Sequence, residues 1–256
     1  MLPVYDLSAA AWALLAVASF LIGISKTALP GLATVTVAAF ASVIPAREST
    51  AVILLLLISG DLVAVWTYRH SVDWRALLRL APPVAVGVLA GVTVLQHISD
   101  GPMKRMIGII LLVLTALTLW LMWRGNRRTQ VGPPGNSFGQ SPVARWAYGS
   151  IGGFTTMVAN SGGPPMSLYF IASGFNMTRF LGTQAWFFFL VNLTKVPFQV
   201  GLGLHSAASL GTDLLLVAFV LAGAVVGRTI IKKINPKVFN PIIIGLTVVS
   251  SVYLLF

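Results

Sequence analysis

Apolar stretches of about 20 residues, the length needed to cross the hydrocarbon core of a bilayer, recur along nearly the whole chain. Hydrophobic residues make up 57% of the 256 positions and charged residues only 9%, whereas roughly 25% charged residues is typical of a soluble domain. No segment is long and polar enough to fold separately as a soluble domain. We therefore expect an all-α polytopic membrane protein in which residues 1–256 form a single membrane domain.

Two short polar stretches rich in glycine and proline interrupt these apolar runs. Residues 23–31 have the sequence GISKTALPG, and residues 158–165 have the sequence VANSGGPP. Backbone of this kind at membrane depth has peptide groups that lipid cannot satisfy, so it survives only against protein or around a wet cavity. The two breaks therefore predict a substrate site near the middle of the membrane, although the same residues would also serve simply to turn a packed hairpin.

The second half of the chain repeats the first at an offset of 134 to 137 residues. The matched positions are Pro30 with Pro164, Lys26 with Asn160, Asp61 with Lys195, Gly87 and Gly91 with Gly223 and Gly227, and Gly108 with Gly245. Pairs of small residues four positions apart are typical of close helix packing in membranes. We assign residues 1–123 to a first repeat, residues 124–143 to a cytoplasmic linker and residues 144–256 to a second repeat.

Each repeat consists of a broken segment followed by three predicted spans. The broken segments cover 9–43 and 144–175, and the spans cover 48–67, 77–97, 104–123, 180–201, 210–229 and 238–256. If each broken segment crossed the membrane once, seven loop cations would lie on one side and eight on the other, which is no bias. If each is instead a re-entrant hairpin, twelve lie on one side and three on the other, as the positive-inside rule requires.

The charge count therefore predicts two inverted repeats, each a re-entrant helical hairpin plus three transmembrane helices. Both termini are expected on the non-cytoplasmic side. The net charge of +11 reflects these short basic loops, so we do not expect nucleic acid as a partner.

Three charged residues remain inside apolar segments after the loop cations are set aside. Lys26 and Lys195 are intramembrane cations, which cost several kcal/mol unless they are solvated or paired, so an anion is the expected ligand. The alternative is that both lysines reach the interface or pair with backbone carbonyls. Asp61 is the only acidic residue well inside an apolar run. It either couples transport to a proton or forms a fixed ion pair with one of the lysines.

The residues around the breaks extend the predicted anion site. A helix that resumes after each proline would direct free N–H groups and the positive end of its dipole at the break. In the next helix, Asn192 and Gln184 would hydrogen-bond either the substrate or a neighbouring helix. Besides Lys26, Lys195 and Asp61, the candidate site residues are Thr27, Pro30, Gly31, Asn160, Ser161, Gly162, Gly163 and Asn192.

Signatures of soluble-type enzyme chemistry are missing from the sequence. It has no H-E-x-x-H, no credible serine-hydrolase triad and no Walker loop, and it has no cysteine. We therefore expect no enzyme activity, no cofactor and no catalytic or metal-ligating residue.

The motifs resemble those of the sulfite exporter TauE/SafE family of membrane permeases. The matching features are the first break with Lys26, the Gly60-Asp61 pair leading to residues 68–75, and the second break leading to Leu168 and Tyr169. The resemblance covers essentially the whole chain. It implies a secondary carrier of sulfur-containing anions such as sulfite, sulfoacetate and related organosulfonates, in a bacterial inner membrane.

The sequence therefore predicts an exporter of a small sulfur-containing anion that works by alternating access around a midplane site. Its partners would be the anion, membrane lipid and, if Asp61 titrates, a proton. A passive anion channel is the main alternative, and a membrane-embedded enzyme or a scaffold is a weaker one.

Overall fold

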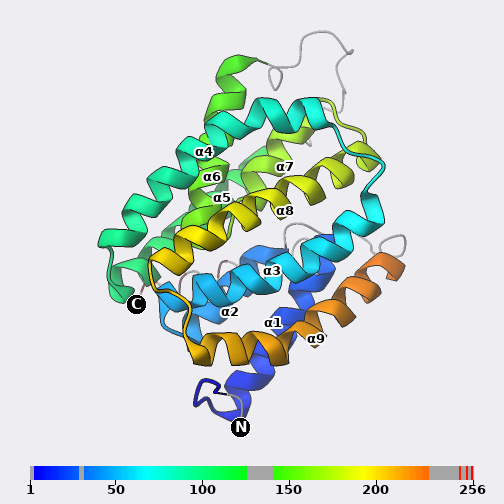
Figure 1. Ribbon diagram of the computed structural model, residues 1–256. Coiled ribbons are helices and arrows are strands. Elements are labelled where there is room, and N and C mark those ends of the chain that lie inside the picture. The colour runs from blue at the N-terminus through cyan, green and yellow to red at the C-terminus, as the bar shows by residue number, and fades with distance from the viewer. Residues whose placement is uncertain are drawn as a thin grey trace.

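The computed structural model describes residues 3–28, 32–125 and 141–230, together with residues 248, 252 and 255. Within these residues the chain is helical and has no strand. The helices are α1 (Ala9–Thr27), α2 (Ala33–Val43), α3 (Ala46–Tyr68), α4 (Trp74–His97), α5 (Asp100–Gly125), α6 (Pro142–Ala159), α7 (Gly163–Ala172), α8 (Met177–Gly201) and α9 (Ala207–Ile230) (Figure 1).

The helices match the predicted segments closely. Helices α3, α4, α5, α8 and α9 cover five of the six predicted spans, and the sixth, at 238–256, lies outside the described residues apart from three isolated positions. The predicted linker likewise lies mostly outside them. Four described helices are long and apolar enough to cross a membrane, namely Ala9–Thr27, Ala46–Tyr68, Trp74–His97 and Ala207–Thr229.

Helix starts follow from local capping chemistry. Ser8, Asp73, Ser141 and Asn176 are the N-caps of α1, α4, α6 and α8, and each side chain accepts a hydrogen bond from a backbone N–H in the first turn. Such caps satisfy donors that the helix itself leaves unpaired. The polar residues that separate the apolar runs therefore also fix where the helices begin.

Both predicted broken segments fold as pairs of helices that return to the end of the molecule where they began. Before α1, the hydroxyl of Tyr5 donates a hydrogen bond to Glu48 in the first turn of α3, so α1 and α2 together form a hairpin. In the second segment, Gly152 of α6 packs against Met166 of α7, because the chain reverses at Asn160. Asn160 ends α6 in the left-handed conformation, with φ 49°, which asparagine tolerates better than most residues.

One helix of each half packs against a helix of the other half. Helix α1 packs along α9 of the second half, and its counterpart α6 packs along α4 of the first half. Both contacts are made by the small residues singled out in the sequence: a Cβ on Gly223 would lie 2.0 Å from the carbonyl oxygen of Phe20, and one on Gly87 would lie 2.1 Å from that of Ser150. These glycines are needed because backbone approaches backbone at both crossings.

Helices α3 and α8, which occupy matching positions in the two halves, pack against each other in opposite directions (Figure 1). Asp61 in α3 contacts Asn192 in α8, whereas Asp73, beyond the end of α3, contacts Thr183 near the start of α8. The two helices therefore run antiparallel through the centre of the protein.

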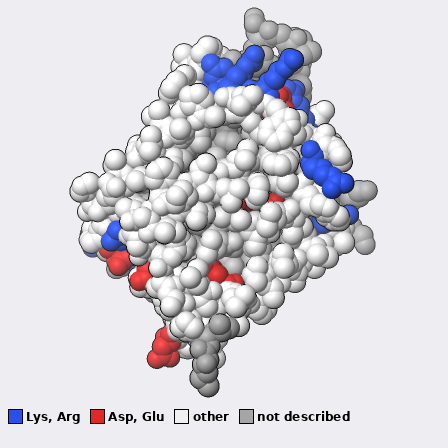
Figure 2. All heavy atoms as spheres, viewed as in Figure 1, with Lys and Arg blue, Asp and Glu red and all other residues white. Residues whose placement is uncertain are grey.

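Charge separates the two ends of the helix bundle. We call the end that contains Tyr5, Glu48 and Asp100 the N-terminal end, and the opposite end the arginine end. In Figure 2 most Lys and Arg side chains gather at the top and right of the molecule. The described cations of the arginine end are Arg69, Arg75, Arg79, Arg145, Arg179 and Arg228, whereas Arg47, Lys104 and Arg105 lie at the N-terminal end.

Candidate functional site

Lys26 and Asp61 form an ion pair in the protein interior. Lys26 lies in the last turn of α1, where a cation also suits the negative end of the helix dipole. Its Nζ lies 2.7 Å from Asp61 Oδ1 in α3, and the two side chains are 10% and 1% exposed. The same Nζ lies 4.9 Å from the centre of the Phe188 ring. Of the two sequence-based alternatives for Asp61, the structure has the ion pair with Lys26.

Lys195 is fully buried but has only neutral oxygens around its ammonium group. Its Nζ donates to Asn160 Oδ1 at 2.6 Å, to Asn192 Oδ1 at 3.3 Å and to Thr156 Oγ1 at 3.4 Å. Neither ion pair found among the described residues includes it. Burying a cation without a directly bound anion is unfavourable, so Lys195 is the group in this interior that most needs an anionic partner.

Asn192 joins the two lysine clusters into one network. Its Nδ2 donates to Asp61 Oδ2 at 2.7 Å, and its Oδ1 accepts from Lys195. Asn160 extends the network to backbone, because its own Nδ2 donates to the carbonyl oxygen of Thr50 at 2.9 Å. We refer to Lys26, Asp61, Asn192, Lys195 and Asn160 as the central polar network.

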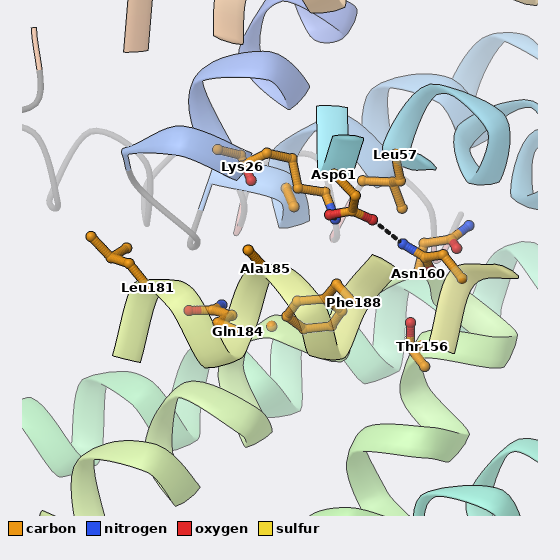
Figure 3. A pocket seen from close by; sticks show the side chains of 13 residues that line it. Lys26, Leu57, Asp61, Thr156, Asn160, Leu181, Gln184, Ala185 and Phe188 are labelled. Atoms are coloured by element: carbon orange, nitrogen blue, oxygen red, sulfur yellow. Dashed lines mark hydrogen bonds and ion pairs between the residues drawn. The ribbon is translucent and has the colours of Figure 1, made fainter. Parts of the chain in front are cut away.

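A cavity of about 40 Å³ lies beside this network, between the two halves (Figure 3). A single water needs about 10–15 Å³ by the same kind of measure, so the cavity has room for a small polyatomic ion. Figure 3 shows Lys26 and Asp61 pointing toward each other on one side, with Gln184, Ala185 and Phe188 of α8 opposite. The lining residues are Ser25, Lys26, Ala33, Leu57, Asp61, Thr156, Asn160, Gly163, Leu181, Gln184, Ala185, Phe188 and Asn192.

The first residues of the two helices that follow the breaks, Ala33 of α2 and Gly163 of α7, both line this cavity. The expected convergence of two helix N-termini is therefore present. Pro164 and Pro165 have no N–H group, so the first turn of α7 has few free donors and Gly163 is the one at the cavity. The positive end of each helix dipole still favours negative charge there.

The structure brings most of the predicted site residues together, but not all of them. Lys26, Asp61, Asn160, Gly163, Asn192 and Lys195 line the cavity or belong to the central polar network. Thr27 lies away from it, with its hydroxyl donating to the carbonyl oxygens of Gly23 and Ala224 at the crossing of α1 with α9. Ser161 donates to the carbonyl oxygen of Ala159, and Gly162 packs against Thr156 and Phe188. Pro30 and Gly31 lie outside the described residues.

Several lining residues were not candidates from the sequence, and a helical pattern would have found some of them. Gln184, Phe188, Asn192 and Lys195 are spaced four, four and three residues apart, so they share one face of α8. Thr156 lies four residues before Asn160 and therefore on the same face of α6. Ser25 gave no such signal, because every residue around it is apolar or belongs to the break.

The network has a chemical character suited to binding rather than to bond breaking. Its ionisable groups are two lysines and one aspartate, and of these only Lys26 and Asp61 are paired with each other. Among the described residues no group of three or more His, Cys, Asp or Glu side chains is arranged to hold a metal ion. A buried polar site inside a helical bundle that is apolar enough to cross a membrane is typical of a membrane transport protein.

Comparison with known protein families also indicates a membrane transport protein. Residues 15–254 match the family model described as "Sulfite exporter TauE/SafE". The chain belongs to this family, so it is an integral membrane transport protein and not an enzyme, as the sequence predicted. No curated protein and no solved structure matches the chain.

Proposed function

We propose that this protein is a secondary transporter that exports a small sulfur-containing oxyanion, such as sulfite, sulfoacetate or another organosulfonate, through the cavity beside the central polar network. The observation that carries the proposal is the environment of Lys195, a fully buried cation whose hydrogen-bond partners are all neutral. Lys195 does not line the cavity itself but contacts Thr156, Asn160 and Asn192, which do, so an oxyanion there would supply the missing negative charge across these residues. Membership of the sulfite exporter family indicates the class of anion.

The residues of the cavity have distinct roles in this proposal. Lys195 and Lys26 attract the anion, and Asp61 holds Lys26 in position. The start of α7 at Gly163 offers a backbone donor, and the side chain of Asn160 turns between Lys195 and the anion. Phe188 and Leu57 form the apolar wall, which suits the sulfur centre or the carbon chain of an organosulfonate.

Transport proceeds by alternating access of two inverted repeats around this site. The antiparallel packing of α3 on α8 supports the inversion, because helices related by an axis along the membrane normal would run parallel. The exchanged pairs, α1 with α9 and α6 with α4, supply two equivalent crossings about which the halves rock. The substrate lies at the interface between them, where movement of one half relative to the other opens either end.

The arginine end faces the cytoplasm of a bacterium, and both termini lie on the other side of the inner membrane. The concentration of Arg side chains at that end supports this orientation. A reporter that is active only in the cytoplasm should be silent when fused after Phe256 and active when inserted in the loop at 126–140. The reverse pattern would contradict the orientation.

The central test is binding and flux with purified protein. In a thermal-shift panel, sulfite and sulfoacetate should raise the melting temperature, whereas acetate and zwitterionic taurine should not, because only ligands of the folded state stabilise it. In proteoliposomes, unlabelled sulfite trapped inside should accelerate entry of labelled sulfite. A passive channel would not show this counterflow. Absence of both stabilisation and flux for every sulfur anion would overturn the proposal.

A further inference from the structure

A second buried acid lies at the N-terminal end, away from the central polar network. Asp213 is in the second turn of α9 and is 7% exposed. Neither of its carboxylate oxygens is accessible, and neither has a hydrogen-bond partner within the described part of the chain. The sequence did not predict this burial, because Asp213 stands near the start of a predicted span, where an acid normally reaches water.

The segment before α1 covers Asp213. A Cβ on Gly211 would lie 1.9 Å from the carbonyl oxygen of Pro3, and the backbone N–H of Tyr5 lies 3.5 Å from Thr212 Oγ1. The hydroxyl of Tyr5 donates to Glu48. Burial and the Glu48 carboxylate raise the pKa of Tyr5, so the phenol stays protonated.

Among the described residues, no cation faces Asp213 from the elements packed around it. The charged residues of α3 are Arg47, Glu48 and Asp61. The Arg47 guanidinium donates to the carbonyl oxygen of Leu95, and its backbone N–H donates to Asp100. Helix α1 contributes only Lys26, which is paired with Asp61.

His205 precedes α9, and burial lowers the pKa of its ring, so it is neutral near pH 7. Both of its nitrogens are buried without a partner within the described residues. An ionised Asp213 would therefore be a buried, uncompensated charge beside a second acid, Glu48.

We propose that Asp213 binds a proton in this conformation and is the residue through which the transporter takes up a proton from the N-terminal end. The proton rests on one carboxylate oxygen and neutralises the side chain while the end is closed over it. Release follows when movement of α9 and the N-terminal segment exposes the carboxylate to water. Coupling of this proton to anion movement rests on the proposed transport function, whereas proton binding itself does not.

One face of α8 connects Asp213's end of the molecule to the central site. Gln199 follows Lys195 by one helical turn toward the N-terminal end and is fully buried, and neither atom of its amide has a partner among the described residues. Gln199 is therefore a buried polar group on the N-terminal side of Lys195 that a proton path through α8 would use. Asp61 is unsuited to the same role here, because it already binds Lys26 and Asn192.

The experiment compares Asp213→Asn, Asp213→Glu and the control Asp6→Asn, which removes an exposed acid from the same end. In proteoliposomes, a pH gradient should accelerate wild-type sulfite flux. Asp213→Asn should lose this acceleration and keep sulfite counterflow, whereas Asp213→Glu and Asp6→Asn should keep both. Acceleration that persists in Asp213→Asn would overturn the proposal while leaving the transport function standing.

A second measurement does not depend on transport. In detergent, the melting temperature of the wild type should fall as the pH is raised from about 5 toward 9, because the unfolded chain releases the Asp213 proton above about pH 4 whereas the folded state retains it until the buried carboxyl ionises. The fall should be smaller in Asp213→Asn and unchanged in Asp213→Glu and Asp6→Asn. Equal slopes for the wild type and Asp213→Asn would overturn the proposal even if no sulfur anion is transported.

Discussion

The two breaks occupy matching positions in the two halves, but their chemistry differs. In the first half the break carries Lys26 and the following span carries Asp61, and the two form an ion pair. In the second half the equivalent positions are Asn160 and Lys195, joined by a hydrogen bond of 2.6 Å. The lysine of the first half therefore has a carboxylate bound to it, whereas the lysine of the second half has none.

The two halves therefore have different tasks: the first half holds its break in place with an ion pair, and the second half offers a lysine to a ligand. The ion pair fixes the geometry of the first break, and Lys26 needs no bound anion to neutralise it. The lysine of the second half is held by amides, which orient an ammonium group but do not neutralise it. If the two halves are inverted repeats, as proposed, the site between them is itself asymmetric.

The largest expected effect is that of removing Lys195. Lys195→Ala should weaken sulfite binding on the order of 1,000-fold and stop transport, because a buried hydrogen-bonded charge is lost from the site. Titration of the purified variant by calorimetry checks this. Arg75→Ala removes an exposed cation and should bind normally. Lys26→Ala should also stop transport with the protein still folded, but a larger loss of affinity in Lys26→Ala than in Lys195→Ala would reverse the division of roles.

The next effect concerns the stability of the first break. Lys26→Met or Asp61→Leu alone should destabilise the fold by about 3 kcal/mol, because each leaves a buried charge unpaired. The double variant should recover most of that loss, since it removes both charges. Denaturation of the four proteins gives the coupling energy. Additive losses would mean that the pair contributes nothing as a pair.

The crossings of α4 with α6 and of α1 with α9 should lose similar stability when a methyl group is added at their central glycine. Gly87→Ala and Gly223→Ala should each cost about 2 kcal/mol, because the added Cβ would meet a carbonyl oxygen of the facing helix. Gly101→Ala is the control, since nothing lies within 4 Å of its Cβ position. Melting temperatures in detergent provide the comparison. A large loss at one crossing and none at the other would show that the halves are not equivalent there.

The smallest effect should come from the ion pair between Asp73 and Arg179, which joins the halves at the arginine end. Burial raises the pKa of Asp73, but the Arg179 guanidinium and the N–H of Ala76 outweigh it and the pKa is lowered. Stabilisation by this carboxylate is therefore present above about pH 4 and is lost as the pH falls below that value.

Asp73→Asn should therefore cost at most about 1 kcal/mol at pH 7, because Arg179 is half exposed. The difference from the wild type should disappear near pH 3, as thermal unfolding at the two pH values can show. The positions that match this pair at the N-terminal end are Ala207 and Pro45, which cannot form one. A cost at pH 7 that persists at pH 3 would contradict the assigned cause.

The sequence by itself determined the membrane class, the helix positions and the two breaks. Apolar length and local capping act over one or two turns, so they can be read from neighbouring residues. The offset of the repeat also predicted that the small residues at 87–91 and 223–227 pack helices, because Gly is required wherever backbones touch. The family resemblance, drawn from the same motifs, is confirmed over residues 15–254.

Only the tertiary structure decided which polar groups meet. Asp61 had two lysines as possible partners, and the approach of α1 to α3 gave it Lys26. Thr27, one residue further on, turns toward α9 instead. Asp213 is buried because a segment about 200 residues away in the chain covers it. Such contacts join distant residues, and in apolar helices with little periodicity no local pattern records which face each helix presents to its neighbours.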